Sequence, residues 1–395
     1  MSPSNEIRAL FVVNTLKRRG AEQQLFSFIK ELPHHVDVDI FRFSNVDDEF
    51  PEFFNYPRVE VHSSKYSGTY NFLRFKSLYE CLSQNRYDVV ITTGLGAALF
   101  FGRICAYLSG IKIIYSLLNT FANFYNLPTL PGDYFDILNK GLNTLTPCVP
   151  GKKIYRFLPN SEKLAAKIRP VVNGYPVHTL HNGLPRKELE TLSTHSPDDQ
   201  TQSIYNQFEG YPTIIQVGAL DGTKNQLFTL ECIKDIKEHV PDVRYLVIGE
   251  GDKKSELVTW VSSNGLDRQV IFAGQLDRMD CLYLIKKSNL LVLTSDSESF
   301  PNVLLEAQAL SLPVVTFDVG AASEIIEHGA TGYVIPRGDH AGFRKYVIEL
   351  LTDKDLGARM GMIGQKRVLN LFSMDRKIEK FLSILEKDAL LNSCL

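Results

Sequence analysis

The sequence has few cysteines, and none of them is closely paired. Six cysteines are spread over 395 residues, with no C-x-x-C pair among them. Close pairs are typical of zinc sites, and dense sets of cysteines are typical of small secreted domains held by disulfides. The spacing therefore predicts neither a metal-binding knuckle nor a disulfide framework, and it favours a reduced, cytoplasmic setting.

The chain also lacks a large net charge and a long apolar run. A formal net charge of -2 gives no overall attraction to nucleic acid. The most apolar stretch, Val89–Leu118, is interrupted by residues such as Arg103 and Lys112, so no membrane-spanning run of about 18 uncharged apolar residues remains. It predicts a strand, a buried helix and a second strand. The polar segment Met1–Arg8 has no apolar core of the kind that a secretory signal requires.

What the chain does have is length and a repeated alternation of patterns. A chain of 395 residues exceeds what one hydrophobic core usually supports, so two domains are expected. Short β-branched runs alternate with helical stretches, as in Ile7–Asn14 followed by Ala21–Leu32, and in Thr213–Gly218 followed by Gln226–His239. Such alternation is typical of parallel sheets with crossover helices. The prediction is an α/β fold of two facing, Rossmann-like, doubly wound domains.

The domain boundaries follow from changes in composition. Residues 1–183 form the first predicted domain, which includes a helix capped by Ser161 and a strand at His178–His181. Residues 184–209 are polar and lose the periodicity, which predicts a linker. Residues 210–371 form the second domain, and 372–395 form an amphipathic C-terminal helix expected to pack back across the cleft.

The segment Glu298–Glu306 carries the clearest chemical pattern. It joins a predicted buried strand, Leu290–Leu293, to a helix opened by Pro301. Proline suits the first helical turn, and the amides of that turn form an anion site beside the positive helix end. Glu298 and Glu306 flank this site, roughly 10 Å apart by helical rise. Because carboxylates accept hydrogen bonds from vicinal hydroxyls, the segment fits a sugar and a ribose joined by a diphosphate.

These glutamates, spaced as Glu-x7-Glu, and a series of glycine-rich loops together resemble the retaining glycosyltransferases of family 4, which have the GT-B fold. The resemblance covers nearly the whole chain. The other matching segments are Gly20–Gln24, His181–Gly183, Val217–Gln226, Ile248–Gly251, Phe272–Gly274, Asp318–Glu324 and Gly329–Gly332.

The resemblance implies a role for each matching residue. Glu306 would bind the ribose, Glu298 the hydroxyls of the transferred sugar, and Lys224 the donor phosphates. A lysine there neutralises the leaving diphosphate as charge builds in the transition state, so no metal is expected. The expected catalytic residues are Glu298, Lys224 and Asn119. The expected donor-binding residues are Gly20, Gly218, Lys224, Asn225, Gly249, Gly274, Glu298, Phe300, Asn302, Val303 and Glu306. The expected acceptor-binding residues are Gly20, Ala21 and Asn119.

The implied activity is retaining, metal-independent transfer of a hexose or N-acetylhexosamine from a nucleotide-diphosphate sugar, with UDP favoured and GDP left open. The expected acceptor is a saccharide or lipid-linked saccharide, in the synthesis of a bacterial surface polysaccharide. No cofactor besides this co-substrate and no nucleic acid partner are expected. Two interpretations stay open for the basic segment Lys17–Arg19, which are a peripheral contact with the inner face of the membrane and a solvated loop. Two also stay open for the aromatic side chains within 121–135, which are the same membrane contact and a buried cluster.

Two departures from the family pattern keep other functions in view. Ala219 stands where the family often has arginine, and Ile113–Thr120 offers no histidine, while Asn119 cannot act as a base. A nucleotide-sugar isomerase of the same fold and a catalytically inactive nucleotide-sugar-binding partner are therefore alternatives. A dehydrogenase is disfavoured because the pair Gly94 and Gly96 lacks the third glycine of a dinucleotide fingerprint.

Overall fold

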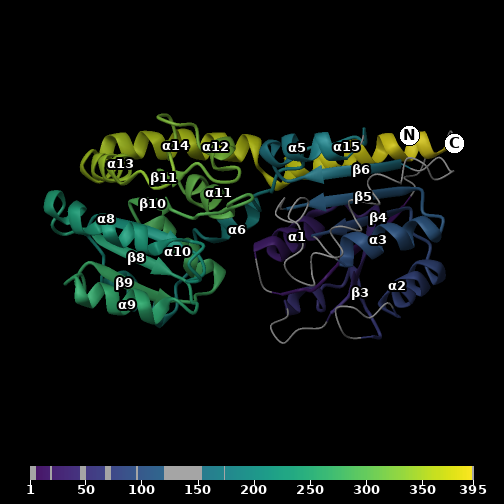
Figure 1. Cartoon of the computed structure of the whole chain (residues 1–395), viewed down its shortest axis with the longest axis horizontal. Coiled ribbons are helices and arrows are strands. Elements are labelled where there is room, and N and C mark those ends of the chain that lie inside the picture. The colour runs from purple at the N-terminus through teal and green to yellow at the C-terminus, as the bar shows by residue number, and fades with distance from the viewer. Residues whose placement is uncertain are drawn as a thin grey trace. The chain divides into compact units, whose positions relative to one another are not determined.

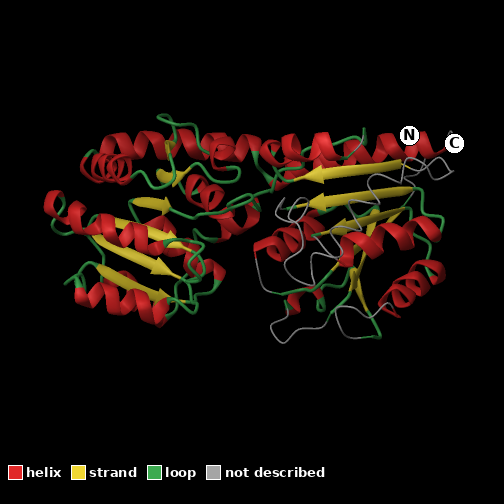
Figure 2. Cartoon of the chain, viewed as in Figure 1, coloured by secondary structure: helices red, strands yellow, loops and turns green. Residues whose placement is uncertain are grey.

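The computed structural model describes residues 6–17, 20–44, 50–66, 73–94, 97–119, 154–172 and 174–393. The chain forms two compact units (Figure 1). Unit 1 contains Met1–Gly183 together with Met374–Leu395, and unit 2 contains Leu184–Ser373. In each unit, strands alternate with helices along the chain (Figure 2).

Unit 1 is built on a six-stranded parallel sheet in the order β3-β2-β1-β4-β5-β6. Its strands are β1 (Ile7–Val13), β2 (Val36–Arg42), β3 (Val59–Ser63), β4 (Val89–Thr93), β5 (Ile113–Leu118) and β6 (Ile154–Pro159). Its helices include α1 (Gly20–Glu31), α2 (Leu73–Gln84), α3 (Ala97–Leu108) and α5 (Glu162–Ile168), with the short turns η1 (Pro51–Phe53) and η3 (Arg169–Val171). The central strands are apolar on both faces because crossover helices cover both sides of a parallel sheet.

Unit 2 repeats this architecture with the sheet order β12-β11-β10-β7-β8-β9, again all parallel. Its strands are β7 (Thr213–Val217), β8 (Arg244–Ile248), β9 (Val270–Gly274), β10 (Leu290–Leu293), β11 (Val314–Phe317) and β12 (Gly332–Ile335). Its helices are α6 (Arg186–Thr191), α7 (Asp199–Asn206), α8 (Gln226–His239), α9 (Lys254–Ser263), α10 (Arg278–Lys287), α11 (Asn302–Ala309), α12 (Ala322–Ile325), α13 (His340–Thr352) and α14 (Lys354–Leu371).

Both sheets have the doubly wound order in which the strand sequence reverses beside the first strand. The reversal lies between β1 and β4 in unit 1 and between β7 and β10 in unit 2. In open α/β sheets, ligands bind outside the carboxyl ends of the strands at this point. The topology therefore directs attention to the loops that follow β7 and β10.

Most predicted elements are confirmed, including the strand, buried helix and strand of Val89–Leu118 as β4, α3 and β5. The Ser161 hydroxyl accepts a hydrogen bond from the Leu164 amide at 3.1 Å and caps α5, as predicted. The strand predicted at His178–His181 is wrong. That segment follows β6 through isolated backbone bonds, such as Leu180 amide to Pro159 carbonyl at 2.7 Å, without forming a strand.

The linker predicted at 184–209 is not irregular. It contains α6 and α7, and its apolar residues Leu192, Ile204 and Phe208 are buried in the core of unit 2. The polar composition reflects the solvent faces of two short helices, while a few apolar side chains anchor them. This segment is therefore part of unit 2, and one of its residues reaches the candidate site.

The C-terminal helix α15 (Met374–Ser393) returns the chain to unit 1. Phe381 is fully buried and lies edge-on to Phe28 of α1, with ring centroids 5.2 Å apart. Asp388 is also fully buried, and its carboxylate accepts hydrogen bonds from Arg156 of β6 and, at 2.7 Å, from the Tyr115 hydroxyl of β5. These contacts fix α15 against the helix and strands of unit 1.

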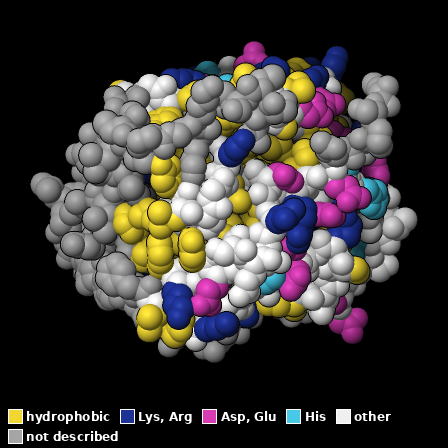
Figure 3. Space-filling view, turned by 90° about the vertical axis from the view of Figure 1, so that its right-hand side faces the viewer, with side chains coloured by type: hydrophobic (Ala, Val, Ile, Leu, Met, Phe, Trp, Pro, Cys, Tyr) yellow, Lys and Arg dark blue, Asp and Glu magenta, His cyan; other side chains and the backbone are white. Residues whose placement is uncertain are grey.

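Among the described helices, none is both long and apolar enough to cross a membrane. On the face of unit 1 drawn in Figure 3, Lys and Arg side chains lie among Asp and Glu side chains. The described residues of that face therefore form no broad basic surface of the kind that attracts nucleic acid. Arg18, Arg19 and the aromatic residues of 121–135 lie outside the described residues.

Candidate active site

Three glycines shape the carboxyl edge of the unit 2 sheet. The Gly218 amide donates to the Ile248 carbonyl at 2.9 Å, and the Gly249 amide donates to the Gly274 carbonyl at 2.8 Å. A Cβ on Gly249 would lie 2.0 Å from the Gly218 carbonyl oxygen, which no side chain tolerates. The predicted glycines thus let the ends of β7, β8 and β9 approach closely and keep this edge open for a ligand.

Lys224 lies in the loop between β7 and α8, directly over Gly218. A Cβ on Gly218 would lie 3.1 Å from Cγ of Lys224, so a side chain there would displace the lysine chain by a few tenths of an ångström. The buried Gln216 side chain of β7 donates to the Lys224 carbonyl at 2.8 Å and to the Thr294 hydroxyl at 3.1 Å. Asn225 follows in the left-handed conformation and caps α8. The loop is therefore held by hydrogen bonds from both β7 and the end of β10.

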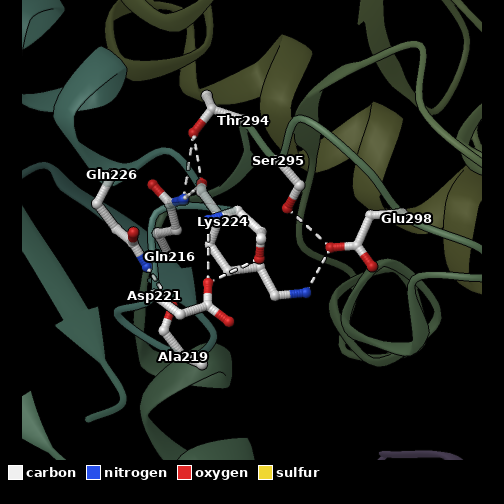
Figure 4. Close-up of polar contacts among 9 residues, drawn as sticks. Gln216, Ala219, Asp221, Lys224, Gln226, Thr294, Ser295 and Glu298 are labelled. Atoms are coloured by element: carbon white, nitrogen blue, oxygen red, sulfur yellow. Dashed lines mark hydrogen bonds and ion pairs between the residues drawn. The ribbon is translucent and has the colours of Figure 1, made fainter. Parts of the chain in front are cut away.

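Lys224 and Glu298 meet across the strand-order reversal. The Lys224 ammonium lies 2.6 Å from the Glu298 carboxylate, which also accepts a hydrogen bond from the Ser295 hydroxyl at 2.7 Å (Figure 4). The side chains of Lys224 and Glu298 are 24% and 12% exposed. The structure thus brings together two residues predicted to act on the donor, one a cation and the other an acceptor of hydrogen bonds.

Gly320 places the Glu298 loop from the other side. Its φ of +52° is in the left-handed region, and a Cβ there would lie 2.6 Å from the Glu298 carbonyl oxygen and 2.5 Å from that of Ser299. The Ala321 amide donates to the same Ser299 carbonyl at 2.9 Å. The turn after β11 therefore packs its backbone directly on the loop that carries Glu298.

Glu306 lies inside α11, whose first residues are Asn302 and Val303 and whose N-cap is Pro301. The prediction had Pro301 as the first helical residue, so the helix begins one residue later than expected. Glu306 is buried, and its carboxylate accepts a hydrogen bond from the Arg278 guanidinium at 2.8 Å. Phe300 is buried and packs edge-on to Phe372, which anchors the residue just before the helix.

Arg278, the first residue of α10, has a second carboxylate partner in Glu188 of α6, 2.6 Å from its Nε atom. Burial opposes the charge of Arg278, but the carboxylates of Glu306 and Glu188 hold the pKa of its guanidinium above the ordinary value. Sequence reasoning missed this contact because Glu188 lies in the predicted linker, 90 positions from Arg278. The feature of the sequence that could have pointed to Arg278 is its place as a cation shortly after β9, at the carboxyl edge of the sheet.

The remaining predicted site residues belong to unit 1. Gly20 and Ala21 open α1, and Asn119 follows β5. Gly20 and Ala21 begin the helix that follows β1, and Asn119 comes directly after β5, so all three follow the carboxyl ends of parallel strands, where unit 1 would accept a ligand. Their roles toward a donor or an acceptor stay predictions. Ala219 contributes its carbonyl, which accepts a hydrogen bond from the Gln226 side chain at 3.0 Å.

One group of described residues has the spacing of metal ligands: Asp39, Glu60 and His62, on β2 and β3 of unit 1. The Arg8 guanidinium lies 3.1 Å from Asp39 and already supplies a cation. A hydrogen bond to Asp39 raises the pKa of His62, which favours the protonated ring that cannot bind a metal. The group therefore fits an ion-pair network better than a metal site.

Known glycosyltransferases resemble the chain in sequence. Residues 198–367 match the family model described as glycosyl transferases group 1. The chain is 28% identical over 208 residues to the N-acetyl-alpha-D-glucosaminyl L-malate synthase of Bacillus anthracis, covering 51% of this chain and 54% of that protein. It is 23% identical over 308 residues to the UDP-Gal:alpha-D-GlcNAc-diphosphoundecaprenol alpha-1,3-galactosyltransferase of Escherichia coli, covering 77% and 76%.

Solved structures of similar fold cover nearly the whole chain. A glycosyltransferase from Rickettsia africae superposes with a TM-score of 0.79 at 16% identity, over 98% of this chain and 99% of that one. Anabaena HepE in complex with UDP and glucose superposes with a TM-score of 0.75 at 17% identity, over 96% and 100%. At such identities the likeness is one of fold, and the fold is GT-B.

The matched family model and the two relatives agree with the prediction of a glycosyltransferase. The aligned part spans about half the length of the Bacillus anthracis relative, at 54%, so particular substrates do not carry over from it. The assignment to family 4 and the roles of the two glutamates stay predictions.

Proposed function

We propose that the protein is a retaining, metal-independent glycosyltransferase that moves a hexose or N-acetylhexosamine from a UDP-sugar to a saccharide or lipid-linked saccharide. The observation that carries the proposal is the placement of Lys224 and Glu298 in contact, at the carboxyl ends of β7 and β10. Ligands of doubly wound sheets bind at this point of strand-order reversal.

The proposed donor site uses three features of unit 2. The first turn of α11 lies at the positive end of that helix, where a diphosphate is favoured. The Lys224 ammonium supplies a cation beside it, and leaves Glu298 when phosphate oxygens compete for it. Glu298 is then available to accept hydrogen bonds from the hydroxyls of the transferred sugar.

Lys224 also supports transfer without a metal. Negative charge builds on the diphosphate as the glycosidic bond breaks, and a preorganised cation stabilises that charge more in the transition state than in the ground state. Activity that survives exhaustive treatment with EDTA would support this part of the proposal. Activity that EDTA abolishes and Mg²⁺ or Mn²⁺ restores would refute it.

The choice of UDP and of the acceptor class rests on similar proteins. The Escherichia coli relative is named for UDP-Gal and an undecaprenol-linked acceptor, and the HepE structures contain UDP. A thermal-shift screen of UDP, GDP, ADP and their sugars tests the donor, because a specific ligand raises the melting temperature by mass action. A rise with GDP or ADP but none with UDP would exclude the proposed donor.

The reaction itself is tested with the donor that the screen selects and a panel of saccharide and lipid-linked acceptors. The proposal predicts a glycoside whose anomeric configuration, read from proton NMR couplings, matches that of the donor. Inversion would refute retention. Conversion of the donor without an acceptor would favour the isomerase alternative, and binding without any turnover would favour an inactive partner.

A further inference from the structure

Arg278 is held between two carboxylates that come from different helices. Its Nη1 atom donates to Glu306 of α11 at 2.8 Å, and its Nε atom donates to Glu188 of α6 at 2.6 Å. The three side chains are 28%, 12% and 26% exposed, respectively for Arg278, Glu306 and Glu188. The Glu306 carboxylate is thus largely shielded from water, which strengthens its hydrogen bond, while the contact with Glu188 is partly exposed.

The position of Arg278 is unfavourable for an arginine unless it has partners. As the first residue of α10, it lies beside the positive end of that helix, where cations are disfavoured. Two carboxylates for one guanidinium more than offset this effect and leave the cluster with an excess of negative charge. The two carboxylates therefore hold Arg278 at a position that would otherwise disfavour a cation.

Glu306 needs such a partner because it is buried inside α11. An ionised carboxylate in that setting is costly unless it is paired. In the described part of the chain, Arg278 donates the hydrogen bond that the Glu306 carboxylate accepts. A carboxylate has about four acceptor positions, so this bond fixes one oxygen and leaves the other for hydroxyl groups.

We propose that Arg278 is a positioning residue that orients the Glu306 carboxylate toward the ribose of the donor, and that Glu188 holds Arg278 in place for this task. The contacts from Glu188 through Arg278 to Glu306 select a ribonucleotide over a 2′-deoxyribonucleotide, because a fixed carboxylate can accept hydrogen bonds from both vicinal hydroxyls of the ribose. The inference rests on the proposed function and on the predicted role of Glu306 in binding the ribose.

The geometry requires arginine specifically. Two different edges of the guanidinium, Nε and Nη1, contact two separate carboxylates at the same time. A lysine has a single ammonium on a flexible chain and lacks this planar fork. Arg278→Lys keeps the charge without the fork, so it is expected to restore part but not all of the ribose preference that Arg278→Met loses, and a purely steric role would not explain that recovery.

The test measures the dissociation constants of UDP and 2′-deoxy-UDP, and of GDP and 2′-deoxy-GDP, by isothermal titration calorimetry on the full chain. The ratio of each pair gives the ribose preference. We expect Arg278→Met and Glu306→Gln each to lower this ratio about tenfold, as for loss of one charge-assisted hydrogen bond. Glu188→Gln is expected to lower it about threefold, as for loss of a partly exposed ion pair.

Two further variants separate positioning from direct contact. If Arg278 acts through Glu306, Arg278→Met adds nothing to the ribose preference in the Glu306→Gln background. Arg344→Met is the matched control, because Arg344 is also an arginine of unit 2 with one carboxylate partner, Asp235 at 2.9 Å, on α13 and α8. It should leave the ratio unchanged.

A folded Arg278→Met protein with an unchanged ratio would overturn the inference while the proposed function stands. Independent, additive losses in the double variant would also overturn it, because Arg278 would then act on the ligand directly. If Arg278→Met fails to fold, Arg278→Lys and Glu188→Gln decide the question by the same ratio. A wild-type protein that binds none of the four nucleotides would overturn the proposed function and the inference with it.

Discussion

Replacing Lys224 with methionine tests both the ion pair and its role in transfer. Methionine keeps an unbranched apolar chain of similar length over Gly218, so the substitution removes the charge with little change in packing. Glu298 then keeps the Ser295 hydroxyl, at 2.7 Å, but loses its cation. The variant thus isolates what the ammonium contributes.

The expected cost in stability follows from the exposure of the pair. Fully exposed pairs contribute about 0–1 kcal/mol, and removing one partner of a buried pair costs about 3–5 kcal/mol. With side chains 24% and 12% exposed, Lys224 and Glu298 lie between these limits, and we expect a loss of about 2 kcal/mol. For a domain of the size of unit 2, that lowers the melting temperature by about 4–8 °C.

The expected cost in catalysis is larger than the cost in binding. Loss of one preorganised charge-stabilising group lowers kcat by about 10²–10³-fold, whereas the amides of α11 still bind the diphosphate. Differential scanning calorimetry of Lys224→Met, Glu298→Gln and the double variant gives the coupling energy, and steady-state kinetics gives kcat and KM. Strictly additive losses of stability would refute the ion pair. An unchanged kcat with a raised KM would refute the role in the transition state.

Three further predictions address other parts of the structure. Glu306→Ala should weaken nucleotide binding about tenfold in calorimetric titration, since it removes the acceptor proposed for the ribose. Gly320→Ala should cost about 2 kcal/mol more than Gly338→Ala in chemical denaturation, because both glycines have positive φ but only the first would drive a Cβ into the Glu298 loop. Burial lowers the pKa of Lys377 in α15 to about 8 from an ordinary value of 10.5, so the unfolded chain binds more protons between these values and stability rises with pH through that window. Lys377→Met should therefore raise the melting temperature at pH 7, with a gain that shrinks toward pH 10; a gain that grows with pH would contradict the shift.

The sequence predicts those features that depend on local pattern. The strands β7, β8 and β10 and the helix α8 are short-range consequences of β-branched runs and helical periodicity, and their bounds agree with the prediction to within a residue. The glycine turns at Gly218 and Gly249 follow from the same alternation, because each ends a strand. The order of the strands then follows from the rules of doubly wound sheets.

Contacts between distant segments could not be predicted in this way. Lys224 and Glu298 were each expected at the donor, but no pattern shows that residues 74 positions apart bind each other in the absence of a ligand. Glu188 was not predicted as a site residue because it lies in a polar segment that was interpreted as a linker. Short amphipathic helices have the same polar composition when only one narrow stripe of each helix is buried. Residues that act through a partner are visible only once the tertiary structure pairs them.

A crystal structure of the complex with UDP or with the nucleotide sugar that the screen selects tests the central claim most directly. The proposed site predicts phosphate oxygens at the first turn of α11 and beside the Lys224 ammonium, ribose hydroxyls at Glu306, and, with the intact donor, sugar hydroxyls at Glu298. A nucleotide bound elsewhere on unit 2, with both carboxylates turned away from it, would contradict the claim.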